Sequence, residues 1–261
     1  LRNLRKLARK IRALRFENGA LDFALPEVHC DLDAEGNPVG FTRRGATEAY
    51  NLVEECMLAA NQAVARKVHA AGMPGIYRVH DEPSDEQWAR MADELRSLGH
   101  RTPPESAQDL NRIARSVFGK PEQYMVTLTL LRNMKRAAYE AECRPHFGLG
   151  FTHYAHFTSP IRRYPDVVVH RAVRAHLRKE KAAGGALVAR AAAESSRLER
   201  RAMDVEREVL DLYRCEVAKK HLGEVHAATV TGASANGPYV DIDDPFLSGI
   251  VKVEGAGDGA W

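Results

Sequence analysis

Apolar residues recur every three or four positions along much of the chain, a spacing typical of helices that bury one face. The first such helix is expected at the start of the chain and ends near Gly19. Its apolar positions are Leu1, Leu4, Leu7, Ile11 and Leu14. A second helix is expected over about 46–71. Its inward positions would be Leu52, Val53, Cys56, Met57, Ala60 and Val64.

Helix start and stop signals predict further helices downstream. Ser84 and Gln87 have capping-box spacing, so a helix is expected from there to Gly99. Another is expected over about 105–118, and Pro121 begins the next. The face of that helix would contain Tyr124, Leu128, Leu131 and Ala138. One more reaches about residue 181, and after a Gly-Gly break a long helix repeats Leu198, Ala202, Val205, Val209 and Leu212.

Strands are expected in three places. Val28, Cys30 and Leu32 alternate with polar residues and the stretch AEGN follows, which predicts a hairpin. GIYRVH reads as a short strand. From Gly223 onward, short alternating runs are separated by Gly, Asn and Pro, as in the first strands of a small barrel. The pattern predicts an α+β protein, with a mixed helical and sheet domain over 1–222 and a partial all-β barrel over 223–261.

The composition is that of an ordinary globular protein. Of the 261 residues, 44% are hydrophobic and 28% charged, and no run of eighteen apolar residues suggests a membrane-spanning helix. The first residues lack the apolar core of a signal peptide. The cysteines are far apart and show no CxxC spacing, so we expect reduced thiols and a cytoplasmic location. They are Cys30, Cys56, Cys143 and Cys215. No membrane partner is expected, since no long apolar run is present.

Charge is unevenly distributed although the net charge is only +3. Residues 1–16 carry seven Arg and Lys and no acid, and residues 159–181 carry seven basic and two acidic side chains. Residues 224–261 carry six acidic side chains and one basic one. Basic stripes in a nearly neutral chain favour a track for a polyanion, and solvated helix faces are the alternative.

The stretch HYAHFTSPIRRYPDVVVH, residues 153–170, has an unusual density of polar and ring side chains. Ser159 and Pro160 read as an N-cap and first helical residue, which would place Arg162 and Arg163 in a first turn that favours anions. Pro165 would limit that segment to about one turn.

Other side chains of the same stretch suit a phosphate. Arginine offers a planar fork that matches phosphate oxygens. Thr158 and Ser159 add hydroxyl donors, and Tyr164, His153 and His156 can stack or hydrogen-bond. The stretch therefore favours a nucleotide phosphate cradle. In the alternative, the arginines pair with acids elsewhere in the chain.

These residues also resemble a known family. HFGLGFTHYAHFTSPIRRYPDVVVHRAV is similar to the signature of the ribonuclease II / ribonuclease R family of 3′-to-5′ exoribonucleases. RFENGALDF, EAYNLVEECMLAANQAVA, YRVHDEP, LLRNMKRAAYEAECRPHFGL and RRAMDVEREV resemble its nuclease (RNB) domain in the same order, and the segment from Gly223 resembles the OB-type RNA-binding domain that follows.

The resemblance implies roles for individual residues. Arg162 matches an arginine that contacts phosphate near the scissile bond, and Glu206 matches an acid near the product nucleotide, so both are expected at the catalytic site. Phe23 matches an aromatic residue that stacks on a terminal base, and Glu54 matches a carboxylate that contacts a ribose hydroxyl. Alone, Phe23 would read as core, Glu54 as a surface carboxylate and Glu206 as half of an ion pair. His156, Thr158, Ser159, Arg163 and Tyr164 are also expected to bind RNA.

The resemblance further implies a magnesium-dependent reaction whose metals are held by an aspartate cluster. In the family this cluster lies upstream of the helix with which this chain starts. DLDAEG at 31–36 lacks the later Glu of a calcium loop and reads as a hairpin turn, and DIDD at 241–244 reads as a turn at a strand end. His153 and His156 have no acid or Cys partner at convincing spacing. We therefore expect no metal ligands within this chain.

The resemblance thus implies an enzyme that degrades single-stranded RNA processively to nucleoside 5′-monophosphates and is monomeric when intact. This chain would supply the wall that grips RNA and would be inactive without the missing N-terminal part. A noncatalytic RNA-binding relative is the alternative. A helical scaffold whose acidic barrel docks a protein would leave the FTSPIRRYP block unexplained, although the acidic tail is unusual for an RNA-binding barrel.

Overall fold

The computed structural model describes residues 1–23, 27–45, 47–234, 237–242 and 244–252. Helices and small antiparallel sheets share the chain, which confirms the predicted α+β class. The helices are α1 (Arg2–Glu17), α2 (Glu48–Ala70), α3 (Asp85–Ser97), α4 (Ala107–Ser116), α5 (Gln123–Arg132), η1 (Phe147–Leu149), α6 (Tyr164–Arg178) and α7 (Gly185–Lys219). The strands are β1 (Glu27–Leu32), β2 (Pro38–Arg44), β3 (Tyr77–Val79), β4 (Ala138–Glu140), β5 (Ala228–Ser234), β6 (Gly237–Ile242) and β7 (Leu247–Ile250).

The chain forms two compact units. The first contains Leu1–Leu25 and Ala46–Arg200, and the second contains Pro26–Gly45 and Arg201–Trp261. The β1–β2 hairpin thus clusters with the C-terminal part of the chain. The expected domain boundary after residue 222 stays a prediction.

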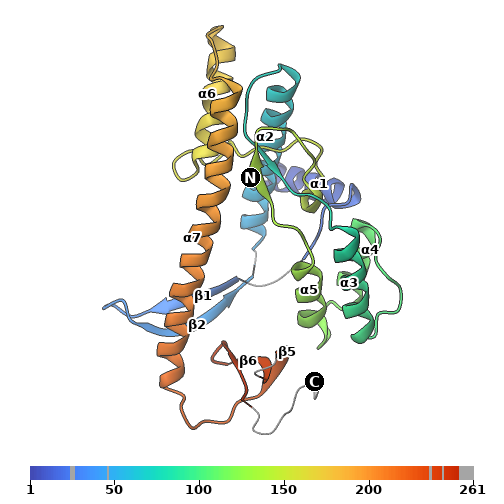
Figure 1. The fold of residues 1–261 in the computed structure, drawn as a ribbon, viewed down its shortest axis with the longest axis vertical. Helices are drawn as coiled ribbons and strands as arrows, with labels where there is room; N and C mark the ends of the chain where they lie inside the picture. The colour runs from blue at the N-terminus through green and yellow to red at the C-terminus, as the bar shows by residue number, and fades with distance from the viewer. Residues whose placement is uncertain (24–26, 46, 235–236, 243, 253–261) are drawn as a thin grey trace. The chain divides into compact units, whose positions relative to one another are not determined.

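Within the first unit, α3, α4 and α5 form a helical group around their own core (Figure 1). The capping box predicted at Ser84 and Gln87 is present at the start of α3. The fifth predicted helix is shorter than expected, because Ala138 lies in β4 rather than in α5. The buried face of α5 also differs from the predicted one, and contains Val126, Thr127, Thr129 and Leu130.

A second core of the first unit packs α2 against β3 and α6. The residues that α2 buries are Glu55, Leu58, Asn61, Ala65 and Val68. This face is rotated from the predicted one, and two of its five members are polar. The rotation has a physical reason, because Glu55 and Asn61 have buried partners that satisfy them.

The second unit combines the hairpin, the antiparallel sheet β5–β6–β7 and the end of α7. Phe41, Val217 and Leu247 form its core. The hairpin predicted around Val28 is present, although Val28 and Leu32 are exposed, and the sheet supplies the strands expected after Gly223.

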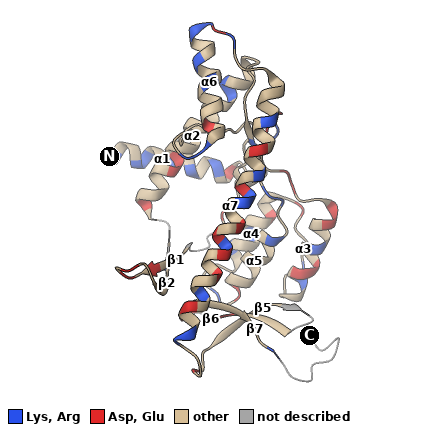
Figure 2. Ribbon diagram, turned by 60° about the vertical axis from the view of Figure 1, so that its left-hand side comes forward, with Lys and Arg blue, Asp and Glu red and all other residues tan. Residues whose placement is uncertain are grey.

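Several apolar residues of two helices are exposed. On α1, Leu4, Leu7 and Leu14 are 40%, 52% and 58% exposed. On α7, the predicted repeat is exposed at Leu198, Val205, Val209 and Leu212. Figure 2 shows the basic residues of α1 in blue. No helix within the described ranges is both long and apolar enough to cross a membrane.

Candidate functional site

The signature loop, residues 153–163, leads from the segment after η1 into α6 (Figure 1). Its last residues form a turn, in which the Arg162 and Arg163 N–H groups lie 3.3 and 3.1 Å from the carbonyl oxygen of Ser159. The helix begins only at Tyr164, so the predicted helix start at Ser159 is wrong. A helix running on from residue 160 would place Pro165 in its interior, where its ring clashes with the carbonyl four residues earlier. Pro165 instead lies in the first turn of α6, a position that suits proline.

Asp166 fixes the end of the signature loop. Its side chain is fully buried, and its Oδ1 accepts a hydrogen bond from the Ser159 N–H at 2.7 Å. The Arg163 guanidinium donates two more, from Nε to Oδ2 and from Nη2 to Oδ1, each at 2.9 Å. The Arg163 fork is therefore occupied within the protein.

Asn61 of α2 fixes the middle of the loop. Its Oδ1 accepts hydrogen bonds from the N–H groups of Phe157 (2.9 Å) and Thr158 (3.2 Å), and its Nδ2 donates to the Tyr154 hydroxyl (3.1 Å). The ring of His170 stacks on Phe157, with centroids 4.0 Å apart, and its Nε2 lies 2.8 Å from the Phe157 carbonyl oxygen. One buried amide thus orders three residues of the loop.

His156, a partly buried residue of the loop, packs edge to face against the rings of Tyr139 and Tyr154. Its Nδ1 shares a hydrogen bond of 2.9 Å with the Tyr139 hydroxyl. Burial, together with the charges of Arg163 and Arg78, lowers the pKa of His156 to about 3. The pKa of His146 is also lowered to about 3, mainly by burial. The contacts that the structure gives His156 are internal, so its contact with RNA stays a prediction.

Arg162 differs from its neighbour. Its side chain is exposed, and it makes no hydrogen bond or ion pair with a residue that the structure describes. Tyr164, two residues later, is 54% exposed. The Thr158 hydroxyl is buried and has no hydrogen-bond partner among the residues that the structure describes, so it can meet a ligand only if the loop shifts. Of the basic groups in the signature loop, Arg162 is the one free to bind an anion.

A charged network joins α1 to α2. The buried side chains of Arg15 and Glu55 are held by two hydrogen bonds of 2.5 and 3.2 Å. The Arg12 guanidinium lies near three carboxylates. Its Nη2 is 3.5 Å from the Oδ1 of Asp22, and its Nη1 is 3.5 Å from the Oε1 of Glu55 and 3.7 Å from the Oε2 of Glu54. Glu54 keeps 52% of its side chain exposed, so it is accessible to a ligand.

The other two predicted site residues lie in different units. Phe23 is partly buried against the core of α3, α4 and α5 in the first unit. Glu206 is exposed on α7, in the second unit. Their roles stay predictions.

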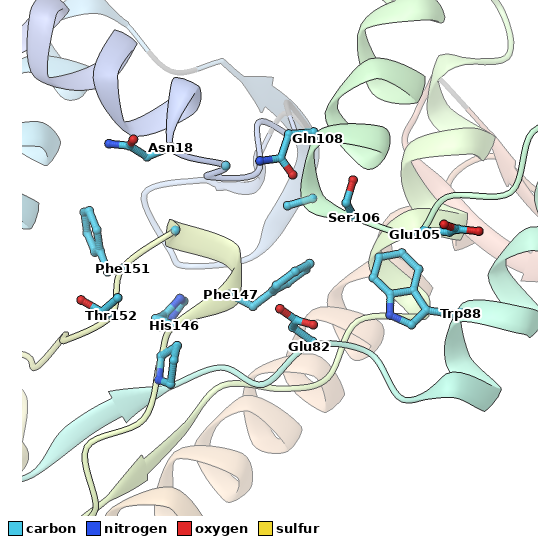
Figure 3. A pocket seen from close by; sticks show the side chains of 14 residues that line it. Asn18, Glu82, Trp88, Glu105, Ser106, Gln108, His146, Phe147, Phe151 and Thr152 are labelled. Atoms are coloured by element: carbon cyan, nitrogen blue, oxygen red, sulfur yellow. The ribbon is translucent and has the colours of Figure 1, made fainter.

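A separate pocket of about 310 Å³ lies in the first unit (Figure 3). Trp88 and Phe147 meet edge to face there, with Glu82 close by. Glu82 and Glu105 line the pocket, and none of its described lining residues is Lys or Arg, which disfavours a phosphate ligand. No residue predicted for the site lines it.

The described residues do not fit a magnesium site. Mg²⁺ prefers octahedral oxygen ligands, whereas the two groups of close metal-ligating side chains in the described part of the chain both contain histidine. The Asp33 carboxylate accepts N–H groups of Glu35 and Asn37, as expected of a turn. Asp241 lies in β6, and Asp243 lies outside the described residues.

Two polar residues of α2 that hold its neighbours in place, Asn61 for the signature loop and Glu55 for α1, were not predicted from the sequence. Asn61 and Glu55 lie on the apolar face of α2, where a search for hydrophobic positions passes over them. Asp166 was detectable, because it lies three residues after Arg163 at the start of a helix, a spacing that favours an ion pair.

The comparisons with known proteins agree with this picture. The family model described as "RNB domain" matches residues 1–179. "Ribonuclease R" of Aquifex aeolicus is 35% identical over 259 residues, which cover 97% of this chain and 37% of that protein. "Ribonuclease R" of Escherichia coli is 34% identical over 269 residues, with 97% and 33% covered. The chain thus spans about a third of the length of these curated relatives.

Solved structures share the fold. Mycoplasma genitalium RNase R in complex with ribose methylated single-stranded RNA has a TM-score of 0.90 at 23% identity, covering 99% of this chain and 42% of that one. Yeast Ssd1, described as a pseudonuclease, has a TM-score of 0.71 at 18% identity, covering 96% and 32%. The chain belongs to the RNB domain family, as its resemblance to the ribonuclease II / ribonuclease R family predicts.

Proposed function

We propose that the intact protein containing this chain is a 3′-to-5′ exoribonuclease that degrades single-stranded RNA processively to nucleoside 5′-monophosphates. Relatives named Ribonuclease R match nearly the whole chain, which supports this proposal. In the proposal this chain forms the side of the RNA-binding channel that contacts phosphate, ribose and base.

The observation that carries the proposal is the different environment of two adjacent arginines. Arg163 is bound to the buried carboxylate of Asp166, whereas the Arg162 guanidinium is exposed and makes no hydrogen bond or ion pair with a described residue. An exposed guanidinium on a turn that Asp166 and Asn61 hold in place is pre-organised for a phosphate. In this proposal Arg162 contacts the phosphate near the scissile bond, and Arg163 positions the turn.

The neighbouring contacts to RNA follow the same logic. Glu54 is half exposed, so its carboxylate can accept a hydrogen bond from a ribose hydroxyl, the group that distinguishes RNA from DNA. Phe23 would stack on a base without selecting its identity. Glu206 would lie near the product nucleotide.

The metal ions belong to another part of the intact protein in this proposal. A magnesium ion would supply charge stabilisation and an activated water. Neither group of ligating side chains in the described part of this chain is an oxygen set that suits it. The curated relatives are about three times as long as this chain, which leaves room for such ligands elsewhere. Residues 1–261 alone are therefore expected to be inactive.

The test is an exchange of Arg162 in the intact protein. Arg162→Ala should lower the rate of mononucleotide release by about 100-fold or more, if the guanidinium stabilises charge that develops in the reaction. RNA affinity should fall much less, and Arg162→Lys should also be slow because the bidentate fork is lost. Arg174→Ala, at an exposed arginine of α6, is the control. Turnover that stays near normal in Arg162→Ala would exclude this role.

A noncatalytic RNA-binding protein is the second candidate. The observation in its favour is the fold shared with yeast Ssd1, which is described as a pseudonuclease. The intact protein would then bind single-stranded RNA and release no nucleotides when magnesium is present. A single assay of binding and release with 3′-accessible RNA separates the two candidates.

A further inference from the structure

Three metal-ligating side chains from distant parts of the chain meet in the first unit. They are His69, Cys143 and His153, and one ligand atom of each lies within 4.8 Å of the others. Sequence spacing gives no sign of this group, because its first two members are 74 positions apart. We propose that this group is a binding site for one zinc ion, a function independent of RNA hydrolysis.

The three ligands come from elements that the fold holds in place. His69 lies in the last turn of α2, and Cys143 follows β4. His153 is the first residue of the signature loop. The rings of His69 and His153 have centroids 4.6 Å apart and are tilted by 57°. Cys143 is a partly buried free thiol that packs against the core of α2 and β3.

The donor set suits zinc. Zn²⁺ prefers nitrogen and sulfur ligands such as two imidazoles and a thiolate, whereas Mg²⁺ prefers oxygen ligands. In a tetrahedral site, Zn–N and Zn–S bonds of about 2.1 and 2.3 Å place ligand atoms roughly 3.5 Å apart. Atoms already within 4.8 Å can reach that spacing by side-chain rotation. Three protein ligands leave a fourth position for water.

A neighbouring hydroxyl orients one ligand. The Thr152 Oγ1 lies 2.9 Å from the Nδ1 of His153, so the other ring nitrogen, Nε2, remains for a metal. Metal-ligating histidines commonly use their second nitrogen in this way. The nearby guanidinium of Arg66 opposes a cation here. A thiolate at position 143 is therefore essential, and the proton of the Cys143 thiol leaves to solvent when the Zn–S bond forms.

A zinc ion would fasten the start of the signature loop to α2. Asn61 of the same helix already holds Tyr154, Phe157 and Thr158. The metal would add a second connection, one residue before Tyr154. Metal binding should therefore stabilise the folded chain, because an ion that binds only the native state shifts the unfolding equilibrium.

The second histidine group provides an internal comparison. His221, Glu224 and His226 lie in the second unit, after α7. The Glu224 carboxylate already lies 2.8 Å from the Nδ1 of His221 and 3.2 Å from the Nε2 of His226. The hydrogen bond between His221 and Glu224 and the close approach of His226 to the same carboxylate account for this group, and its lack of sulfur separates it spectroscopically from the first.

The experiment is a metal titration of the intact, metal-free protein. Co²⁺ serves as the spectroscopic probe, and Zn²⁺ is titrated by calorimetry. Wild-type protein should bind one Zn²⁺ tightly and show a sulfur-to-cobalt charge-transfer band. Cys143→Ser should lose that band and bind Zn²⁺ at least about 100-fold more weakly, and His69→Gln should also weaken binding. Zn²⁺ should raise the unfolding temperature of the wild type and not that of Cys143→Ser.

Matched variants make the result decisive. Cys215→Ser changes an exposed thiol on α7, and His226→Ala disrupts the second group, so both should keep the band and the affinity. The proposal is overturned if the charge-transfer band survives Cys143→Ser or if His226→Ala abolishes tight binding. Absence of tight Zn²⁺ binding by wild-type protein overturns it as well. Since His69 is exposed, His69→Gln should fold even if Cys143→Ser does not.

Discussion

Arg163 donates two hydrogen bonds of 2.9 Å to Asp166, a carboxylate with no exposed surface. Asp166 also accepts the Ser159 N–H, so one buried group ties the two ends of the turn that presents Arg162. The two neighbouring arginines of the signature loop therefore have different environments, since Arg163 is bound to Asp166 within the protein and Arg162 is exposed to solvent. The sequence alone does not distinguish them, because Asp166 lies three residues after Arg163 and four after Arg162, and both spacings allow an ion pair on a helix.

The first prediction concerns this pair. Asp166→Asn removes the charge that compensates Arg163 and replaces one acceptor oxygen with an NH₂ group that faces donors. Breaking a buried pair costs about 3–5 kcal/mol, so the free energy of unfolding should fall by roughly that amount. Urea denaturation measures it. Asp93→Asn is the control, because Asp93 pairs with Arg96 at the same i,i+3 spacing but is 72% exposed. Asp93→Asn should lower the free energy of unfolding by less than about 1 kcal/mol. Similar losses for Asp93→Asn and Asp166→Asn would show that the buried pair with Arg163 does not stabilise the fold.

The second prediction concerns Asn61. Asn61→Ala leaves the N–H groups of Phe157 and Thr158 without their acceptor, at about 1–3 kcal/mol each. The free energy of unfolding should fall, and hydrogen exchange should accelerate at these two amides in particular. Gln62→Ala, at the next position of α2, is the control. Unchanged exchange at residues 157 and 158 in Asn61→Ala would show that the amide does not order the loop.

Local rules predicted much of the secondary structure from the sequence. The capping box at Ser84 and the hairpin around Val28 both depend on residues a few positions apart, and both are present. The helix start predicted at Ser159 failed for an equally local reason. Two prolines compete in that stretch, and Pro165 is the one that lies in the first turn of α6.

The remainder depends on tertiary contacts that no spacing rule reports. A hydrophobic pattern placed the buried face of α2 on the wrong residues, because Glu55 and Asn61 are buried by virtue of partners 40 and 96 positions away. His153 lacked a Cys partner at convincing spacing, yet the fold brings Cys143 beside it. Such sites become visible only when the elements are packed.

The third prediction separates two adjacent carboxylates. Glu55 is 1% exposed and pairs with Arg15, whereas Glu54 is 52% exposed. Glu55→Ala should lower the free energy of unfolding by about 3–5 kcal/mol because it leaves a buried guanidinium unpaired. Glu54→Ala should change it by less than about 1 kcal/mol. Thermal or urea unfolding of the two variants measures the difference. Equal losses of unfolding free energy would show that the ion pair with Arg15 does not account for the burial of Glu55.

The same variant tests the predicted role of Glu54 in RNA selection. If its carboxylate accepts a ribose hydroxyl, Glu54→Ala should narrow the preference of the intact protein for RNA over DNA. Matched RNA and DNA oligonucleotides give the ratio, and Glu48→Ala, at an exposed acid of the same helix, is the control. An RNA-to-DNA ratio that does not change in Glu54→Ala would return Glu54 to the status of a surface carboxylate.

The last prediction follows from the buried histidines. Burial lowers the pKa of His146 and of His156 from an ordinary 6.5 to about 3, so both rings stay neutral in the folded protein where the unfolded chain takes up protons. The unfolded state then binds more protons, and the free energy of unfolding rises with pH. The stability that these rings contribute is present above about pH 6.5 and is lost as the pH falls toward 3.

Between about pH 6 and pH 5, each buried histidine should lower the free energy of unfolding by about 1 kcal/mol. His156→Gln removes one titrating ring and keeps a polar group next to Tyr139, so its stability should depend less steeply on pH. Urea denaturation at several pH values measures the two slopes, and His176→Gln, at an exposed histidine of α6, is the control. The two slopes would coincide if His156 were protonated in the folded protein, and the hydrogen bond to Tyr139 would then need another donor arrangement.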